Sequence, residues 1–206
     1  RGGGWGGRRR ERRGSLGLGM RRPGGEERSG QDRGQEKQGN ASHEAHFTLG
    51  VQRAERRPLY LFLLATLSVG AVSSLLTTPQ IPTWYAGLHH PAIAPPNWVF
   101  GPVWTTLYIL MAIAAWRVWK VTGLRSAAMA AFAIQLALNF AWSAIFFGLH
   151  NIGGALAEIV VLDIAITATV ILFFRQDRLS GLLLLPYLAW VLFATFLTYA
   201  FWGLNG

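Results

Sequence analysis

Five long apolar segments limit what this chain can fold into. They cover residues 58–76, 99–119, 127–149, 152–174 and 181–202. Each has about the 20 residues that a helix needs to cross the ~30 Å hydrocarbon core of a bilayer. In lipid the backbone must satisfy its own hydrogen bonds, and short connections place neighbouring helices antiparallel. The pattern predicts an all-α integral membrane protein, a bundle of five transmembrane helices.

The basic residues of this body predict its orientation. All five of them flank the segments at one end of the expected bundle: Arg117, Lys120, Arg125, Arg175 and Arg178. Residues 77–97 and 150–151, which form the connections at the opposite end, contain no Lys or Arg. Because positive loops stay on the cytoplasmic side, we expect the N-terminus inside and the C-terminus outside. With an even number of spans, these basic residues would no longer all lie on the same side of the membrane.

Residues 1–57 differ in composition from the rest of the chain. They hold 14 of the 19 Lys and Arg residues and 7 of the 10 acidic residues, with frequent glycine. Such a segment cannot bury enough apolar surface to fold, so we expect a disordered Arg/Gly-rich tail, or an over-extended reading frame with Met20 as a later start. A transit peptide or an RNA-binding tail is less favoured. The charge of +9 lies mostly here, so residues 58–206 do not predict a nucleic-acid partner.

The stretch Pro91–Tyr108 is the most unusual part of the body. Its sequence, PAIAPPNWVFGPVWTTLY, holds four prolines, two tryptophans, one phenylalanine and no charge. Paired prolines cannot continue a preceding helix but suit the entry to a new one, with Asn97 as a possible N-cap. We interpret this stretch as the aromatic mouth of the second membrane helix.

Eight of the nine tryptophans lie within residues 58–206. An interfacial belt explains those at segment ends, such as Trp116, Trp119 and Trp202. It does not explain Trp104, Trp142 and Trp190 as well, because an indole N–H in hydrocarbon needs a partner. These inner rings either line a pocket or pack the bundle.

The third and fourth segments carry polar side chains at membrane depth. Gln135, Asn139 and Ser143 share one helix face, where they bond either another helix or a ligand. Glu158 and Asp163 point about 140° apart at 100° per residue, so they do not form a close catalytic pair. A proton-coupled transport role stays open for them.

The sequence contains no motif for a metal site or for hydrolysis. His89, His90 and His150 are the histidines of the body, and we read them as solvated loop residues. Their spacing fits neither a zinc site nor a deep haem ligand, and there is no cysteine. We therefore expect no metal and no required cofactor, and an enzymatic activity stays uncertain.

Three long motifs resemble one known family. TWYAGLHHPAIAPPNWVFGPVWTTLYILMAIAAWRVW, LALNFAWSAIFFG and LLPYLAWVLFATFLTY are similar to segments of the tryptophan-rich sensory protein/translocator protein (TspO/MBR) family, also called the peripheral benzodiazepine receptor family. The resemblance covers residues 58–206. It implies a five-helix bundle, a homodimer among membrane lipids, and a pocket for porphyrins such as protoporphyrin IX or haem.

The resemblance also implies which side chains form the pocket. Trp104 and Trp190 match the tryptophans that the family ties to porphyrin breakdown, and they are the candidates for catalysis. The full set of ligand-binding candidates is Trp84, Tyr85, Trp98, Trp104, Tyr108, Asn139, Trp142, Phe146, Phe147 and Trp190. The implied function is a sensor or transporter in tetrapyrrole homeostasis and stress response. Light-dependent porphyrin degradation and a non-catalytic regulatory scaffold are the alternatives.

Departures from the family pattern indicate a bacterial-type member. Gly154 stands where animal members have a ligand-contacting tryptophan, and Gly203 replaces the basic residue of a cholesterol-recognition motif. We therefore expect the bacterial inner membrane as the location, with an organelle membrane second. Small residues Ala127, Ala128 and Ala131 recur at close-packing spacing, a weak indication of a dimer seam.

Overall fold

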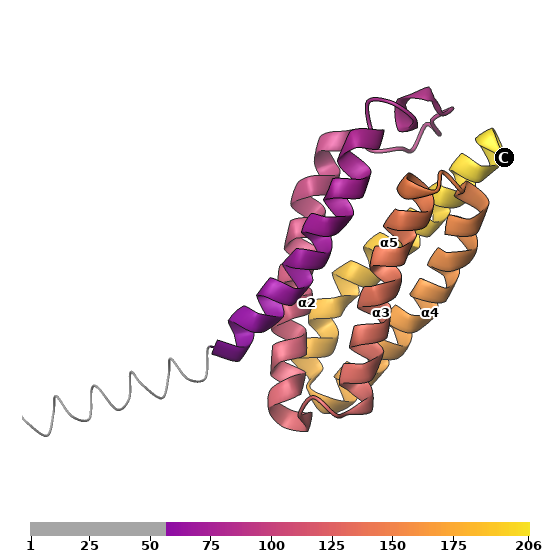
Figure 1. Cartoon of the computed structure of the whole chain (residues 1–206). Coiled ribbons are helices and arrows are strands. Elements are labelled where there is room, and N and C mark those ends of the chain that lie inside the picture. Colours follow the sequence, from indigo (N-terminus) through magenta and orange to yellow (C-terminus); the bar gives the residue numbers. More distant parts are fainter. Residues whose placement is uncertain (1–56) are drawn as a thin grey trace, which may run out of the picture. The chain divides into compact units, whose positions relative to one another are not determined.

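The computed structural model describes residues 57–206, and this part of the chain is helical with no strand. The first span covers Arg57–Gln80, followed by α2 (Phe100–Thr122), α3 (Ala127–Ser143), α4 (Ile152–Gln176) and α5 (Arg178–Asn205) (Figure 1). All five are long and apolar enough to cross a membrane, with mean hydropathies from 1.6 to 2.3. The predicted five-helix membrane fold is confirmed. The predicted tail, 1–57, lies outside the described residues except for Arg57, which begins the first span.

The helices pack around a core that fills the half of the bundle away from the first loop. α5 packs against both α2 and α4, and α4 also packs against α3. Met111 of α2, Ile166 and Phe173 of α4, and Tyr187 of α5 are almost completely buried in one cluster. Small residues of α2, among them Ala114 and Ala115, allow the helices to approach closely there.

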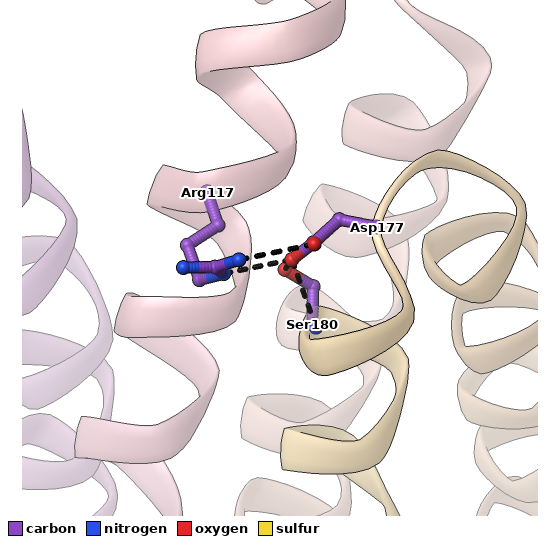
Figure 2. Close-up of polar contacts among 3 residues, drawn as sticks. All are labelled: Arg117, Asp177 and Ser180. Atoms are coloured by element: carbon purple, nitrogen blue, oxygen red, sulfur yellow. Dashed lines mark hydrogen bonds and ion pairs between the residues drawn. The ribbon is translucent and has the colours of Figure 1, made fainter.

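We name the two ends of the bundle by their charge. At the charged end, Arg117 of α2 donates from Nε and Nη2 to the two oxygens of Asp177, at 2.7 and 3.0 Å (Figure 2). Asp177 also caps α5, because it accepts hydrogen bonds from the backbone N–H and the hydroxyl of Ser180. The guanidinium, and after it Ser180, hold the pKa of the Asp177 carboxyl well below its usual range. One carboxylate thus joins α2 to the turn between α4 and α5.

The uncharged end holds the connections 81–96 and 149–151 and the end of α5, none of which contains a charged side chain. The first connection contains a short 3₁₀ turn at Tyr85–Gly87, and a second 3₁₀ turn, Asn97–Val99, leads into α2. The predicted N-cap at Asn97 is wrong: α2 begins at Phe100, and no side chain caps it. The reason is that Val99 already donates its N–H to the carbonyl of Pro96, at 3.0 Å.

Two local irregularities shape the uncharged end further. α3 ends in a π-helical turn, Ala144–Gly148, which turns Phe146 and Phe147 into the bundle. Asn151 then caps α4 by accepting a hydrogen bond from the N–H of Gly154, at 2.8 Å. A Cβ at Gly154 would lie only 2.6 Å from the Asn151 side chain, so the position is tied to this cap.

The alanine seam suggested by the sequence is only partly compatible with the fold. Ala128 is 3% exposed and belongs to the core of the bundle, whereas Ala127 is exposed and Ala131 is half-buried. A buried Ala128 cannot contact a second copy, so it is removed from the proposed seam. The reason is that residues one position apart on a helix point about 100° away from each other.

Candidate functional site

A cavity of about 580 Å³ lies between the helices toward the uncharged end. The first span, α2, α3 with its π turn, α4 and α5 all contribute side chains to its wall. Four tryptophans from three helices meet there: Trp98 and Trp104 before and in α2, Trp142 in α3 and Trp190 in α5. The cavity forms because the core packing of the charged end gives way here to the irregular 3₁₀ and π turns.

Nine of the ten candidate ligand-binding residues line this cavity. They are Tyr85, Trp98, Trp104, Tyr108, Asn139, Trp142, Phe146, Phe147 and Trp190. The tenth, Trp84, lies outside the lining set. It stacks on His150 with ring centroids 4.4 Å apart and meets Phe146 edge-on at 5.4 Å. Trp84 therefore supports the wall of the cavity from behind.

The aromatic rings of the lining support one another in pairs. Trp104 lies 5.5 Å from Tyr108, and Trp142 stacks on Phe146 at 5.1 Å with a 21° angle between the planes. Trp190 meets Phe100 edge-on at 5.9 Å. Such contacts restrict the orientations of the rings, and each contributes about 0.5–1.5 kcal/mol beyond area burial.

A chain of buried hydrogen bonds leads from the cavity into the core. The hydroxyl of Tyr108 donates to Oδ1 of Asn139 at 2.7 Å, and Nδ2 of Asn139 donates to the hydroxyl of Tyr187 at 3.2 Å. Tyr187 in turn donates to Oε1 of Gln135, at 2.8 Å. Asn139 and Gln135 thus bond other helices, one of the two readings of this polar face, while Asn139 and Ser143 also line the cavity.

The first span supplies a wall of the cavity that sequence reasoning missed. Gly70, Ser73 and Ser74 line the cavity from this helix, and a Cβ on Gly70 would lie 2.5 Å from the ring of Tyr108. The run GAVSSLL carries the signal, since small residues mark a helix that approaches its neighbour closely. Tyr187 was also missed, although its place one turn before Trp190 put it in the same motif.

The loop over the uncharged end is held by the three histidines of the body. All three are exposed, as expected of solvated residues. Even so, His150 bonds Oε1 of Gln80 at 3.0 Å, and His90 bonds the carbonyl of Tyr85 at 3.0 Å. Asn205 at the end of α5 both accepts from the N–H and donates to the carbonyl of His89. Burial in this loop raises the pKa of the Tyr85 phenol.

The lining side chains suit a ligand with a large uncharged surface. No Lys, Arg, His, Asp or Glu is among the described residues that line the cavity. Its polar groups are hydroxyls and amides, among them Ser73, Thr77, Asn97 and Asn139. Within residues 57–206 there is also no cluster of three or more His, Cys, Asp or Glu that could hold a metal ion.

Comparison with known proteins places this bundle in a family. A model of the TspO/MBR family matches residues 62–203. The chain is 45% identical to the tryptophan-rich protein TspO of Archaeoglobus fulgidus, over 69% of this chain and 94% of that protein. It is 43% identical to the human translocator protein, over 59% and 75%, and 40% identical to the tryptophan-rich sensory protein of Cereibacter sphaeroides, over 71% and 91%. The chain therefore belongs to the TspO/MBR family of multi-pass integral membrane proteins.

Proposed function

We propose that this protein binds porphyrins of the protoporphyrin IX type in the aromatic cavity. In this role it acts as a sensor or transporter in tetrapyrrole homeostasis and the response to stress. The observation that carries the proposal is the convergence of Trp98, Trp104, Trp142 and Trp190 on one cavity. Two relatives are named translocator protein and tryptophan-rich sensory protein, names that favour transport and sensing over a purely structural role.

The size and chemistry of the cavity fit such a ligand. Its volume of about 580 Å³ lies within the range of small-molecule pockets, about 300–1,000 Å³. A flat macrocycle can stack on indole rings, which bury a large area at little conformational cost. The carboxylates of the ligand would stay at the open end beside Asn97, because the lining offers no cation that offsets their desolvation.

Fluorescence titration tests the proposal. Protoporphyrin IX added to the purified full chain in detergent should quench tryptophan emission with a saturable midpoint. Trp104→Phe/Trp190→Phe should shift that midpoint by about tenfold or more, equivalent to ~1.4 kcal/mol or more. Trp202→Phe is the matched control, since this ring is 45% exposed and does not line the cavity. Quenching that never saturates, or a double variant that matches the wild type, would refute porphyrin binding at this site.

Light-dependent degradation of the porphyrin is the second candidate. Trp104 and Trp190 both line the cavity, so a bound, photo-excited macrocycle would lie against two electron-rich indoles. Illumination of the complex in air should then bleach the porphyrin absorbance faster than for free porphyrin in the same detergent. Equal bleaching rates for the complex and for free porphyrin would refute degradation and leave porphyrin binding as the proposed function.

For the membrane, we propose the bacterial inner membrane, with the N-terminus inside, the C-terminus outside and two copies forming a homodimer. The charge asymmetry between the two ends supports this orientation. Because the chain has no cysteine, Arg125→Cys and Asn205→Cys can each be labelled alone in intact cells. An impermeant maleimide should label only Asn205→Cys. Labelling of Arg125→Cys instead would show that the protein has the opposite orientation.

A further inference from the structure

Among the buried polar side chains of residues 57–206 that have no hydrogen-bond partner at all, two lie on the neighbouring helices α3 and α4. Both carboxyl oxygens of Glu158 are inaccessible and unpaired, and so is the indole Nε1 of Trp142. Buried polar groups are almost always paired, so each exception needs an explanation. An indole N–H can only donate, and a carboxyl group offers acceptor oxygens in either protonation state. The two unpaired groups are therefore chemically complementary.

The fold places these groups at the same depth on neighbouring helices. Trp142 lies six residues before Gly148, where the π turn of α3 ends, and Glu158 lies six residues after Ile152, where α4 begins. At 1.5 Å per residue, both lie about 9 Å from the uncharged ends of their helices. α3 and α4 run antiparallel and pack against each other, so equal depth brings the two residues to the same level.

The helical periodicity also directs Glu158 toward α3. Around the axis of α4, Glu158 lies about 100° to one side of buried Ile159, and Asp163 lies about 40° to the other side. Asp163 accepts a hydrogen bond from the Thr195 hydroxyl of α5, at 2.8 Å, so its side of α4 faces α5. The opposite side, which carries Glu158, faces α3, the other helix against which α4 packs extensively.

Trp142 links this pair to the cavity. Its ring lines the cavity and stacks on Phe146, while its Nε1 lies where water cannot reach it. A pocket that must present this ring to a flat ligand needs the indole fixed on its hidden edge as well. α3 contains no titratable residue that could compete with the indole for Glu158.

We propose that Glu158 is a positioning residue for ligand binding, which acts by accepting a hydrogen bond from Nε1 of Trp142 when a flat ligand packs on the indole from the cavity side. Glu158 itself does not line the cavity, so it acts through Trp142 alone. This inference rests on the proposed function, because it requires a ligand in the cavity.

Protoporphyrin IX titrations of the full chain test the pair by rescue. Glu158→Leu removes every acceptor and should weaken binding about tenfold, equivalent to ~1.4 kcal/mol. Glu158→Gln keeps one acceptor oxygen and should stay within about threefold of the wild type. Asp163→Asn is the matched control, an intramembrane acid on the other side of α4, and should leave the affinity unchanged. If Glu158→Gln loses as much affinity as Glu158→Leu, or if Glu158→Leu binds normally, the proposal is wrong.

A double-mutant cycle with Trp142→Phe separates positioning from general destabilisation. Phenylalanine keeps a stacking ring but has no N–H, so Glu158→Leu should have no further effect on affinity in this background. Additive losses would overturn the proposal. Ultraviolet resonance Raman difference spectra between wild type and Trp142→Phe should show a hydrogen-bonded indole with porphyrin present, and a free one would contradict it. A wild type that does not bind porphyrin at all would instead refute the proposed function.

Discussion

The two ends of the bundle differ in how their side chains are packed and paired. The charged end is closed by Arg117, Asp177 and Ser180 and by a core in which Phe132 stacks on Phe173 at 5.9 Å. The uncharged end replaces ion pairs with 3₁₀ and π turns and leaves a cavity of about 580 Å³ among its rings. The difference suggests a division of labour that can be tested: ion pairing and close packing at the charged end, and an open cavity at the uncharged end.

The largest effect should come from a small residue at the charged end. The Phe174 ring lies so close to Gly181 that a Cβ there would overlap it, and this contact forms the tight packing between α4 and α5. Gly181→Val should therefore lower the free energy of unfolding by about 3 kcal/mol through overpacking. Thermal unfolding in detergent measures the loss. Gly203→Ala, a position with open space around it, is the control and should change little; equal melting of the two variants would contradict a tightly packed charged end.

The buried network between the two ends gives the next effect. Tyr187→Phe removes one acceptor for Asn139 and the donor for Gln135, and both amides are almost completely buried. Amide groups left unpaired in the bundle should lower the free energy of unfolding by about 2 kcal/mol. Tyr199→Phe, on a side chain that is 58% exposed, is the matched control. Similar melting temperatures for both variants would mean that the network does not join the ends.

At the cavity itself we expect a change in binding larger than the change in stability. Gly70→Ala places a methyl group 2.5 Å from the Tyr108 ring, which must then shift into the cavity. Stability should fall by about 1 kcal/mol, because the hollow end leaves the ring room to move. Protoporphyrin IX affinity should fall about tenfold, equivalent to ~1.4 kcal/mol. A variant with normal porphyrin affinity but a large loss of stability would contradict this prediction, because the uncharged end would then be as tightly packed as the charged end.

The comparison also separates what the sequence could predict from what it could not. Features that repeat with the helical period can be predicted from the sequence. The apolar segments predicted all five spans, and the shared face of Gln135 and Asn139 predicted buried polar contacts. Local backbone geometry cannot be predicted in this way. The π turn at Ala144–Gly148 and the 3₁₀ entry before Phe100 depend on tertiary packing, so an N-cap was expected at Asn97 where none forms.

The candidate site shows the same limit at the level of side chains. Nine of its ten residues followed from motifs and line one cavity, but Trp84 points to His150 instead. Its partner His150 lies 66 residues further along the chain, so no short-range pattern could have indicated this contact. The wall from Gly70 and Ser73 was missed because small residues carry little information about what they face until the neighbouring helix is placed.

The smallest expected effect tests whether the charged end depends on its ion pair at all pH values. Interaction with Arg117 lowers the pKa of Asp177 in the folded state, so the stabilisation is present above the unfolded pKa of about 3.9 and is lost as the pH falls through the folded pKa. Both partners are partly exposed, which limits the pair to about 1 kcal/mol. Asp177→Asn should therefore melt lower than the wild type at pH 7. Below about pH 3.9 this advantage should shrink steadily, because the unfolded chain then takes up the proton before the folded one does. Convergence of the two melting temperatures already at pH 5 would show that Arg117 does not hold the carboxylate ionised, and the charged end would then owe its stability to packing alone.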